Sequence, residues 1–514
     1  MPIAQYGSLN TTAIQVPQVA VQLVPPQTRN LNGVPTDMLG LVGVGSWGPV
    51  GAPVVTGSYA DFVGDFGVAA DRAHDLGTAV SVAASQGAQN LRVVRVTDGT
   101  DTAATGSGPA GTITLTARHT GSRGNAATLS LSPGSRANTW RAVVQLPGLL
   151  PEVFDNIAGT GNEFWVNLAA AINLGTGVTR AASRVVTAAA GAATAAPSSA
   201  VLVTMSGGTD GDAVATADLL GSDAYPRTGM HALRGQRVRV LDIAELTDVT
   251  AWPAVATFAA DERCYAVVAG APGESIADAG ALKQAAGIDT DRLKVMLGDW
   301  LFIQDAATGL LRLVSPASVV AGRLANLAPH NSTLNKPVAG IVGSQRSGLP
   351  GAGTGKTYSD AELSALRRFG IDVVTNPSPG GAYWSCRLGV NASSDPAIDG
   401  DNYSRMADYV ATTIEAGTGI YVGEPHTPVL RMQVRSTVDS FLAGLVQQGL
   451  LVEDDEGRPF SVVCDGSNNP ASRKSLGYTQ VDAQVRLTPI NRVLLVNLEL
   501  GQTVKVNSVT SRPL

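Results

Sequence analysis

The chain contains few charged, aromatic and cysteine residues for its length. Of its 514 residues, 15% are charged and 5% are aromatic. Soluble proteins typically carry about 25% charged residues, so we expect this chain to cover part of its surface with partners. An Ala/Gly-rich composition is an alternative explanation for the same numbers. The length exceeds the roughly 250–300 residues that one core accommodates, which predicts two or three domains.

The sequence also lacks the residue patterns of metal, disulfide and cofactor sites. Its three cysteines, Cys264, Cys386 and Cys464, lie far apart and are predicted to be small buried side chains. The five histidines are scattered, without metal-ligand spacing. The acidic run at 453–456 lacks the spacing of a calcium loop and is interpreted as a solvated turn. We therefore predict no catalytic residue, no metal and no cofactor.

Nucleic-acid and membrane binding are not supported by the charge and hydropathy patterns. The formal net charge is −6 and no Lys/Arg-rich run is present, so no direct contact with nucleic acid is expected. The first ten residues lack a secretory signal, which predicts folding in a reducing cytoplasm. The uncharged stretch from Val185 to Met205 is too rich in Ala, Thr and Ser for membrane insertion and is interpreted as a surface linker.

One glycine-rich segment is similar to a nucleotide-binding loop. GAGTGKT at 351–357 ends as a phosphate loop does, but Pro350 stands where the motif needs its first glycine. Proline has a fixed φ and no N–H, so it damages the ring of amides that would bind phosphate. A hydrolase motif is also missing, since 273–277 is only a near match to G-x-S-x-G. A nucleotide hydrolase that uses Lys356 remains an alternative function.

The order of apolar runs predicts an α/β core. Strand and helix patterns alternate over 39–96 and again over about 238–300, which indicates right-handed βαβ units around a parallel sheet buried on both faces. Capping signals mark three helix starts, at Ser58, Ser315 and Ser359. Between the two blocks, residues 101–212 become rich in Thr, Gly and Ser with short alternating runs, which predicts an inserted β-rich domain.

The predicted fold class is an α/β core, a mixed sheet with flanking helices, with an inserted β-rich domain and extended terminal strand arms. The predicted boundaries are an N-terminal strand arm at 1–30, the core at 31–100 and 213–350, the inserted outer domain at 101–212, a C-terminal domain at 351–501, and a C-terminal strand arm at 502–514.

Both ends of the chain show the two-residue alternation of strands. At the N-terminus the alternating residues are Ile14, Val16, Val19, Val21 and Leu23. Near the C-terminus they are Leu494, Val496, Leu498, Val504 and Val506, which predicts a strand whose last part extends beyond its own sheet. Before it, an amphipathic helix is predicted from the apolar stripe Val434, Val438, Phe441, Leu442 and Leu445.

Several segments, taken in order, resemble the contractile tail sheath family of phages, R-type bacteriocins and related injection systems. The resemblance rests on LGLVGVGSWGPVGAPVVTGSYADFVGDFG at 39–67, NLRVVRV at 90–96, ARHTGSRGN at 117–125, SGGTDG at 206–211, SPASVVAGRLA at 315–325, FGIDVVTN at 369–376, FSVVCDGSNNP at 460–470 and PINRVLLVNLEL at 489–500. These segments are spread along most of the chain from 39 to 500.

The resemblance implies a structural subunit and not an enzyme. Family members form stacked rings around an inner tail tube, with both termini reaching into neighbouring subunits, and contract to drive the tube through the target cell envelope for genome ejection. The implied partners are copies of the chain, the tube protein, and the baseplate and tail terminator proteins. The implied location is the virion, after assembly in the host bacterial cytoplasm. Another phage tail or shell protein remains an alternative.

Substitution of the phosphate-loop residues should have no effect on assembly. Lys356→Ala and Thr357→Ala should assemble as the unchanged chain does, and the purified chain should release no phosphate from ATP or GTP, because Pro350 cannot supply the amide that the motif requires. A phosphate-release assay checks this, and turnover that disappears in Lys356→Ala would contradict it.

Overall fold

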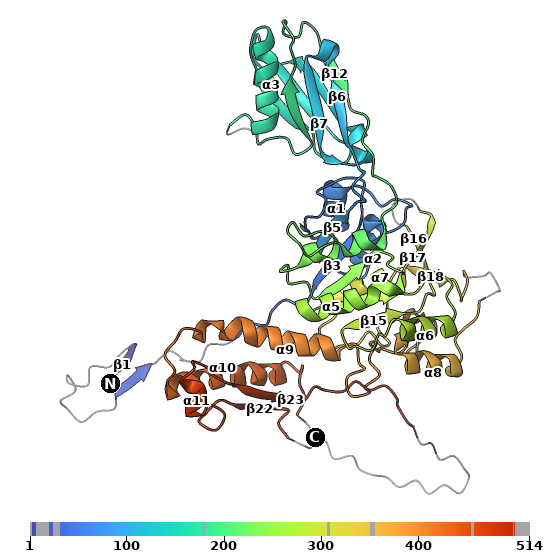
Figure 1. The fold of residues 1–514 in the computed structure, drawn as a ribbon, viewed down its shortest axis with the longest axis vertical. Helices are drawn as coiled ribbons and strands as arrows, with labels where there is room; N and C mark the ends of the chain where they lie inside the picture. Colours follow the sequence, from blue (N-terminus) through green and yellow to red (C-terminus); the bar gives the residue numbers. More distant parts are fainter. Residues whose placement is uncertain are drawn as a thin grey trace.

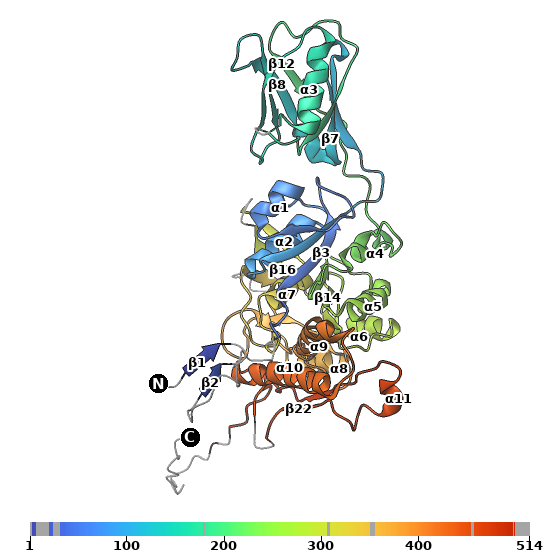
Figure 2. The same cartoon turned by 90° about the vertical axis from the view of Figure 1, so that its left-hand side faces the viewer.

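The computed structural model describes residues 3–6, 20–23, 31–177, 180–305, 309–349, 355–453, 457–496 and 498. The molecule is elongated in both views, with residues 103–204 at one end, a large sheet in the middle, and the C-terminal helices at the other end (Figures 1 and 2). Three hydrophobic regions therefore follow one another along the long axis.

The middle region is built on a seven-stranded sheet in the order β19-β15-β14-β13-β3-β5-β4. Every neighbouring pair is parallel except β4 and β5, so the sheet is mixed. Its strands are β3 (Met38–Val44), β4 (Val54–Thr56), β5 (Asn90–Val96), β13 (Val240–Ile243), β14 (Tyr265–Ala269), β15 (Leu293–Met296) and β19 (Ile371–Asp372). The α/β core with flanking helices predicted from the sequence is confirmed.

Helices cover both faces of this sheet, which explains why its strands are apolar without alternation. All residues of β3, β13, β14 and β15 are buried. On one face lie α1 (Tyr59–Phe66), α2 (Leu76–Ser85), α7 (Pro316–Ala325) and a small sheet of β16 (Leu301–Gln304), β17 (Leu311–Val314) and β18 (Ile341–Ser344). On the other lie α4 (Thr216–Leu220), α5 (Trp252–Glu262), α6 (Ile276–Ala285) and α8 (Asp360–Phe369).

The three predicted helix starts are confirmed by side-chain caps. Ser58 accepts a hydrogen bond from the amide of Asp61, and Ser315 accepts one from Ala317, next to a proline at the first helical position. Ser359 and Glu362 form a reciprocal capping box at the start of α8. Each cap satisfies an amide that the helix itself leaves unpaired.

The region at the other end contains two sheets and one helix around a separate core. The sheets have the orders β10-β9-β8-β12 and β11-β7-β6. The elements are β6 (Ala103–Ser107), β7 (Ile113–Thr120), β8 (Thr128–Pro133), β9 (Trp140–Gln145), β10 (Glu152–Ile157), α3 (Asn162–Leu174), β11 (Val186–Ala190) and β12 (Val201–Thr204). Figure 1 shows this β-rich region connected to the middle region only through a narrow neck.

The surface linker expected between Val185 and Met205 is wrong. The stretch supplies two strands, β11 paired with β7 and β12 paired with β8. Val186 and Val203 are buried, because successive side chains of both strands point alternately toward the core and away from it. Composition concealed the strands, since cross-strand pairing and not side-chain size decides whether such a segment is ordered.

The C-terminal region contains two long helices and a two-stranded antiparallel sheet. Its elements are β20 (Val374–Thr375), β21 (Ser385–Cys386), α9 (Tyr403–Thr418), α10 (Pro428–Gln447), β22 (Phe460–Val463), α11 (Ala471–Lys474) and β23 (Asp482–Val485). The amphipathic helix expected here is present. Val434, Val438, Phe441, Leu442 and Leu445 are all buried, most of them in one cluster with Met406 of α9 and Phe460 of β22.

A buried ion triad joins the central sheet to this region. The Lys294 ammonium on β15 lies 2.7 Å from the carboxylate of Asp372 and 3.1 Å from that of Asp401, and all three side chains are inaccessible to solvent. The two carboxylates raise the pKa of Lys294 although burial opposes this. Asp401 immediately precedes α9, so the triad determines where the C-terminal helices begin.

Where the terminal segments are described, strands are present at the N-terminal end and absent at 486–496 and 498. β1 (Ile3–Tyr6) and β2 (Ala20–Leu23) pair in parallel, so Val21 and Leu23 lie in a strand. Leu494, Val496 and Leu498 belong to no strand and are each at least 73% exposed, because no described strand of the chain pairs with them. Ile14, Val16, Val19, Val504 and Val506 lie outside the described residues.

One buried acid in the middle of the sheet lacks a cation. Asp242 on β13 is inaccessible to solvent; Ser318 Oγ on α7 donates to its Oδ2 at 2.7 Å, and its Oδ1 has no hydrogen-bond partner among the described residues. Burial raises its pKa to about 7, and nearby Glu245 contributes in the same direction. The carboxyl is therefore neutral in the folded chain at acidic pH.

The Asp242→Asn variant should lose a pH dependence of stability. The folded pKa lies above that of an unfolded aspartate, so wild-type stability is complete below the unfolded pKa and falls as pH rises toward about 7. The decline should be roughly 1.4 kcal/mol per pH unit, and Asn should flatten it. Urea unfolding at several pH values measures this. Ser318→Ala, which removes the donor to the carboxylate, should raise the folded pKa further and so extend the decline to higher pH. An unchanged slope in Asp242→Asn would disprove the assignment.

Candidate functional site

The crevice where open parallel sheets usually bind small ligands is filled in this chain. Such ligands lie at the carboxyl ends of strands where the strand order reverses, which here is between β3 and β13. The His74 carbonyl accepts from the Val44 amide at 2.8 Å, and the His74 amide donates to Glu245 at 2.9 Å. A Cβ on Gly43 would lie 2.7 Å from the same His74 carbonyl. The space is therefore closed by the chain itself.

The segment similar to a phosphate loop leads into a helix that is already capped. Residues 350–354, which include Pro350, lie outside the described residues, and Lys356 is exposed. At the start of α8, Glu362 Oε2 accepts from the Ser359 amide at 2.9 Å, and Ser359 Oγ accepts from the Glu362 amide at 3.4 Å. A phosphate at a helix N-terminus needs these amides and the positive dipole end. The Glu362 carboxylate already occupies the position at the start of α8 that a phosphate would take.

The predicted burial of the cysteines is confirmed. Cys264, Cys386 and Cys464 are buried and free, and burial raises the pKa of Cys386 to about 12, so that thiol is not a nucleophile near neutral pH. Within the described ranges, no cluster of three His, Cys, Asp or Glu side chains is arranged to hold a metal ion. No helix in those ranges is long and apolar enough to cross a membrane.

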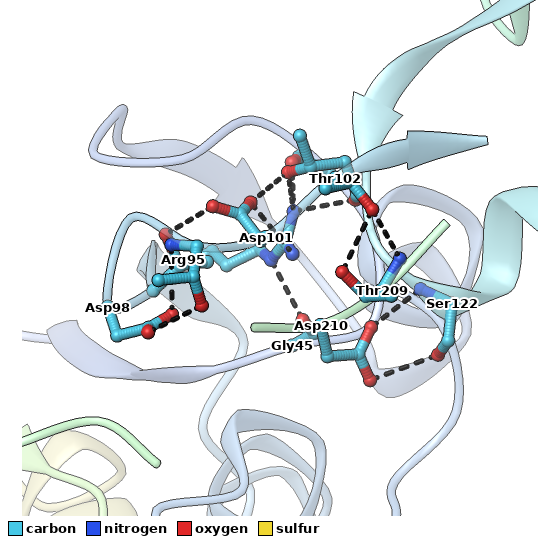
Figure 3. A network of polar contacts seen from close by, with 12 residues as sticks. Gly45, Arg95, Asp98, Asp101, Thr102, Ser122, Thr209 and Asp210 are labelled. Atoms are coloured by element: carbon cyan, nitrogen blue, oxygen red, sulfur yellow. Dashed lines mark hydrogen bonds and ion pairs between the residues drawn. The ribbon is translucent and has the colours of Figure 1, made fainter. Parts of the chain in front are cut away.

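A polar network at the neck connects the β-rich region to the middle region (Figure 3). Arg95, at the end of β5, is inaccessible to solvent. Its guanidinium donates to the carbonyls of Gly45 and Gly48 in the middle region, at 2.8 and 2.9 Å, and to the carbonyl of Thr120 beyond the neck, at 2.9 Å. One buried cation thus binds backbone from both sides of the neck.

Two glycine-rich motifs from the sequence meet at the same neck. Asn125 and Gly208 exchange two hydrogen bonds, with the Asn125 side chain donating at 2.8 Å and accepting at 2.7 Å. Asp210 accepts from the Ser122 amide at 2.6 Å and from the Arg72 guanidinium at 3.0 Å. The resemblance identified ARHTGSRGN and SGGTDG separately; the structure places them side by side. Their function here is to fix the neck.

The two-stranded sheet of β22 and β23 has free edges. These strands pair only with each other among the described residues. Beyond β23 the chain continues as a segment without helix or strand, held at Arg492 by hydrogen bonds of 2.6 and 3.0 Å to Asp399. After Arg492 the side chains of Val493 to Val496 are apolar and 73–84% exposed. The chain thus presents both unpaired edges and unpaired apolar residues.

The N-terminal segment lies on the same C-terminal region. The amide of Val34 donates to Thr413 on α9 at 3.3 Å, and Leu31 packs against the cluster between α9 and α10. In both views the β1–β2 pair stands outside the body of the C-terminal helices (Figures 1 and 2). The segments leading to both termini therefore leave the molecule from one region, although they are far apart in sequence.

Comparison with solved structures shows that this fold is shared with tail sheath proteins over most of the chain. A sheath tail protein from Listeria innocua superposes with a TM-score of 0.60 at 14% identity, covering 90% of this chain and 96% of that one. A sheath tail protein from Desulfitobacterium hafniense gives 0.58 at 15% identity, covering 87% and 93%. The helical sheath of the anti-feeding prophage in its contracted state gives 0.56 at 11% identity, covering 95% and 100%.

No protein-family model matches the chain, and no curated protein sequence does. At 11–15% identity the superpositions establish the fold.

Deletion of residues 101–212 should leave the middle region folded. Thr100 Oγ1 accepts from the Asp212 amide at 3.1 Å, so the two ends lie close enough for a short Gly/Ser linker from Asp98 to Asp212. Arg95 would lose Thr120 but keep Gly45 and Gly48. Thermal unfolding followed by circular dichroism should remain cooperative. The fragment 101–212 should also fold alone, because its core cluster consists of its own residues apart from Trp47 of the middle region. Loss of a cooperative transition in the deletion variant would refute the prediction.

Proposed function

We propose that this chain is the sheath subunit of a contractile tail or injection system, a structural protein that polymerises around an inner tube. The observation that carries the proposal is a fold likeness to sheath proteins that spans the β-rich, middle and C-terminal regions together. A fold shared with one small domain would not distinguish a structural protein from an enzyme. The filled crevice and the capped α8 helix agree with a protein that does no chemistry.

Assembly proceeds by strand exchange between subunits. The free edges of β22 and β23 are templates for pairing, and the exposed apolar run after Arg492 has no strand partner among the described residues. An isolated strand does not hold its conformation, because ordering each residue costs about 1–2 kcal/mol. Pairing of one subunit's terminal segments with a neighbour's sheet fills the free strand edges and gives the exposed apolar run a strand partner. The predicted arms at 1–30 and 502–514 are the segments that we assign to this exchange.

Contraction is a rigid-body rearrangement between two lattice states. The Lys294 triad and the Arg95 network hold the three regions of one subunit together, so relative motion is confined to the terminal segments that link subunits. Free energy stored in the extended lattice then drives the tube forward. We assign the inserted region, which lies at the end far from the C-terminal helices (Figure 1), to the outside of the sheath.

The finer assignments follow from the resemblance. We assign the inner tail tube, the baseplate and the tail terminator as partners besides further copies of the chain, the virion as location, and genome ejection through the host envelope as the purpose of contraction. Imaging the native particle in both states distinguishes a phage from a bacteriocin or another injection system. A different tail or shell protein, the second candidate, would form a polymer that does not shorten.

Disruption of the exposed C-terminal run should abolish polymerisation without unfolding the subunit. Leu494→Lys/Val496→Lys places charge on side chains that contact little in the monomer, so the melting temperature should not change. Electron microscopy of the purified wild-type chain should show hollow tubes or rings, and the variant should remain dispersed. Deletion of 2–24 or 502–514, or proline at Val504 or Val506, should have the same effect, since proline removes a ladder donor.

The matched control is Leu150→Lys, which adds a charge at a side chain that is 90% exposed in the β-rich region. It should polymerise normally. Regular tubes from the doubly substituted or truncated chains would show that these segments do not join subunits, and unfolding of the truncated monomer would show that they belong to its own core.

A further inference from the structure

A cationic cavity lies beside the segment that carries the C-terminal run away from the molecule. Its volume is about 710 Å³, and its walls are α8, the loops around residues 331–336 and 387–388, and residues 490–493. Four cationic side chains line it: Lys336, Arg367, Arg387 and Arg492. The only carboxylate in the lining is that of Asp360, in a chain whose formal net charge is −6.

Two of these four cations, Lys336 and Arg387, have no counter-charge among the described residues. Arg367 and Arg492 share Asp399, at 2.8 Å and 2.6 Å. The Lys336 ammonium and the Arg387 guanidinium are half-buried, and no described carboxylate lies within ion-pair distance of either. Other arginines do have partners, such as three carboxylates for Arg234 and the carbonyl oxygens of Leu324 and Leu327 for Arg405. Partly desolvated cations without partners cost stability, so this arrangement indicates a partner outside the subunit.

We infer that this cavity receives carboxylate side chains of a second copy of the chain. The inference rests on the proposed function, because the wall at 490–493 continues into the apolar run that we assign to a neighbour, which places that neighbour against the cavity. A single inorganic anion does not fill such a volume or engage cations from four separate segments. Several carboxylates of one protein surface do, and the opposite charges would also set the register of docking.

Zero-length cross-linking tests the inference directly. Tubes assembled from a mixture of ¹⁴N- and ¹⁵N-labelled chains are treated with a water-soluble carbodiimide, which couples an amine to a carboxylate in contact with it. Mass spectrometry of the digest should show the Lys336 peptide joined to an acidic peptide of the opposite label, and much less so in dispersed subunits. Coupling only within one chain, or equal coupling in both samples, would overturn the inference.

A charge-neutral variant gives a second readout. Lys336→Gln/Arg387→Gln should raise the critical concentration for assembly roughly tenfold at low ionic strength and reduce its salt dependence. The melting temperature of the monomer should not fall, because neither side chain has a counter-charge among the described residues. Arg136→Gln/Arg141→Gln, exposed in the β-rich region, removes the same charge and should assemble as wild type. Normal tubes without the cross-link contradict only this inference, whereas absence of tubes from the wild-type chain contradicts the proposed function as well.

Discussion

The buried ammonium of Lys294 is the constraint on which the rest of the arrangement depends. It lies on the central sheet and is neutralised by Asp372 from the next strand and Asp401 from the start of the C-terminal region. Burial alone would raise the pKa of Asp401, but Lys294 and neighbouring hydroxyls hold it below its usual value. Because removing one partner from a buried ion cluster typically costs about 3–5 kcal/mol, the sheet and the C-terminal helices cannot separate without unfolding.

Buried cations also connect other parts of the molecule. Arg405 on α9 donates to the carbonyls of Leu324 and Leu327 at the end of α7, and Lys283 on α6 donates to those of Phe369 and Ala392. At the neck, Arg95 binds carbonyls from both sides. Each buried cation satisfies carbonyl oxygens at the ends of helices and strands or in the loops beside them. A chain whose regions are joined in this way is held together as one body.

Features that depend on a few neighbouring residues, such as helix caps, could be predicted from the sequence. Strands that depend on a distant partner strand could not. Ser58, Ser315 and Ser359 cap the helices that they were expected to cap, and the Val434 stripe faces the core, because both effects act within a few residues. The strands at 186–190 and 201–204 were missed, since only the partner strands β7 and β8 reveal them. The alternation at Leu494 predicted a strand, but no described strand pairs with this segment.

The sequence alone determined the fold class, the absence of catalytic and metal-binding patterns, and the likeness to sheath proteins, because hydrophobic periodicity and glycine-rich turns are written in consecutive residues. Only the tertiary structure showed that 117–125 and 206–211 meet at one neck, that His74 closes the ligand crevice, and that Lys336 and Arg387 face one cavity without a counter-charge. These features depend on contacts between residues far apart in the chain. Electrostatic and packing energies fall off over a few ångströms, so they are decided by position in space and leave no signature in the order of residues.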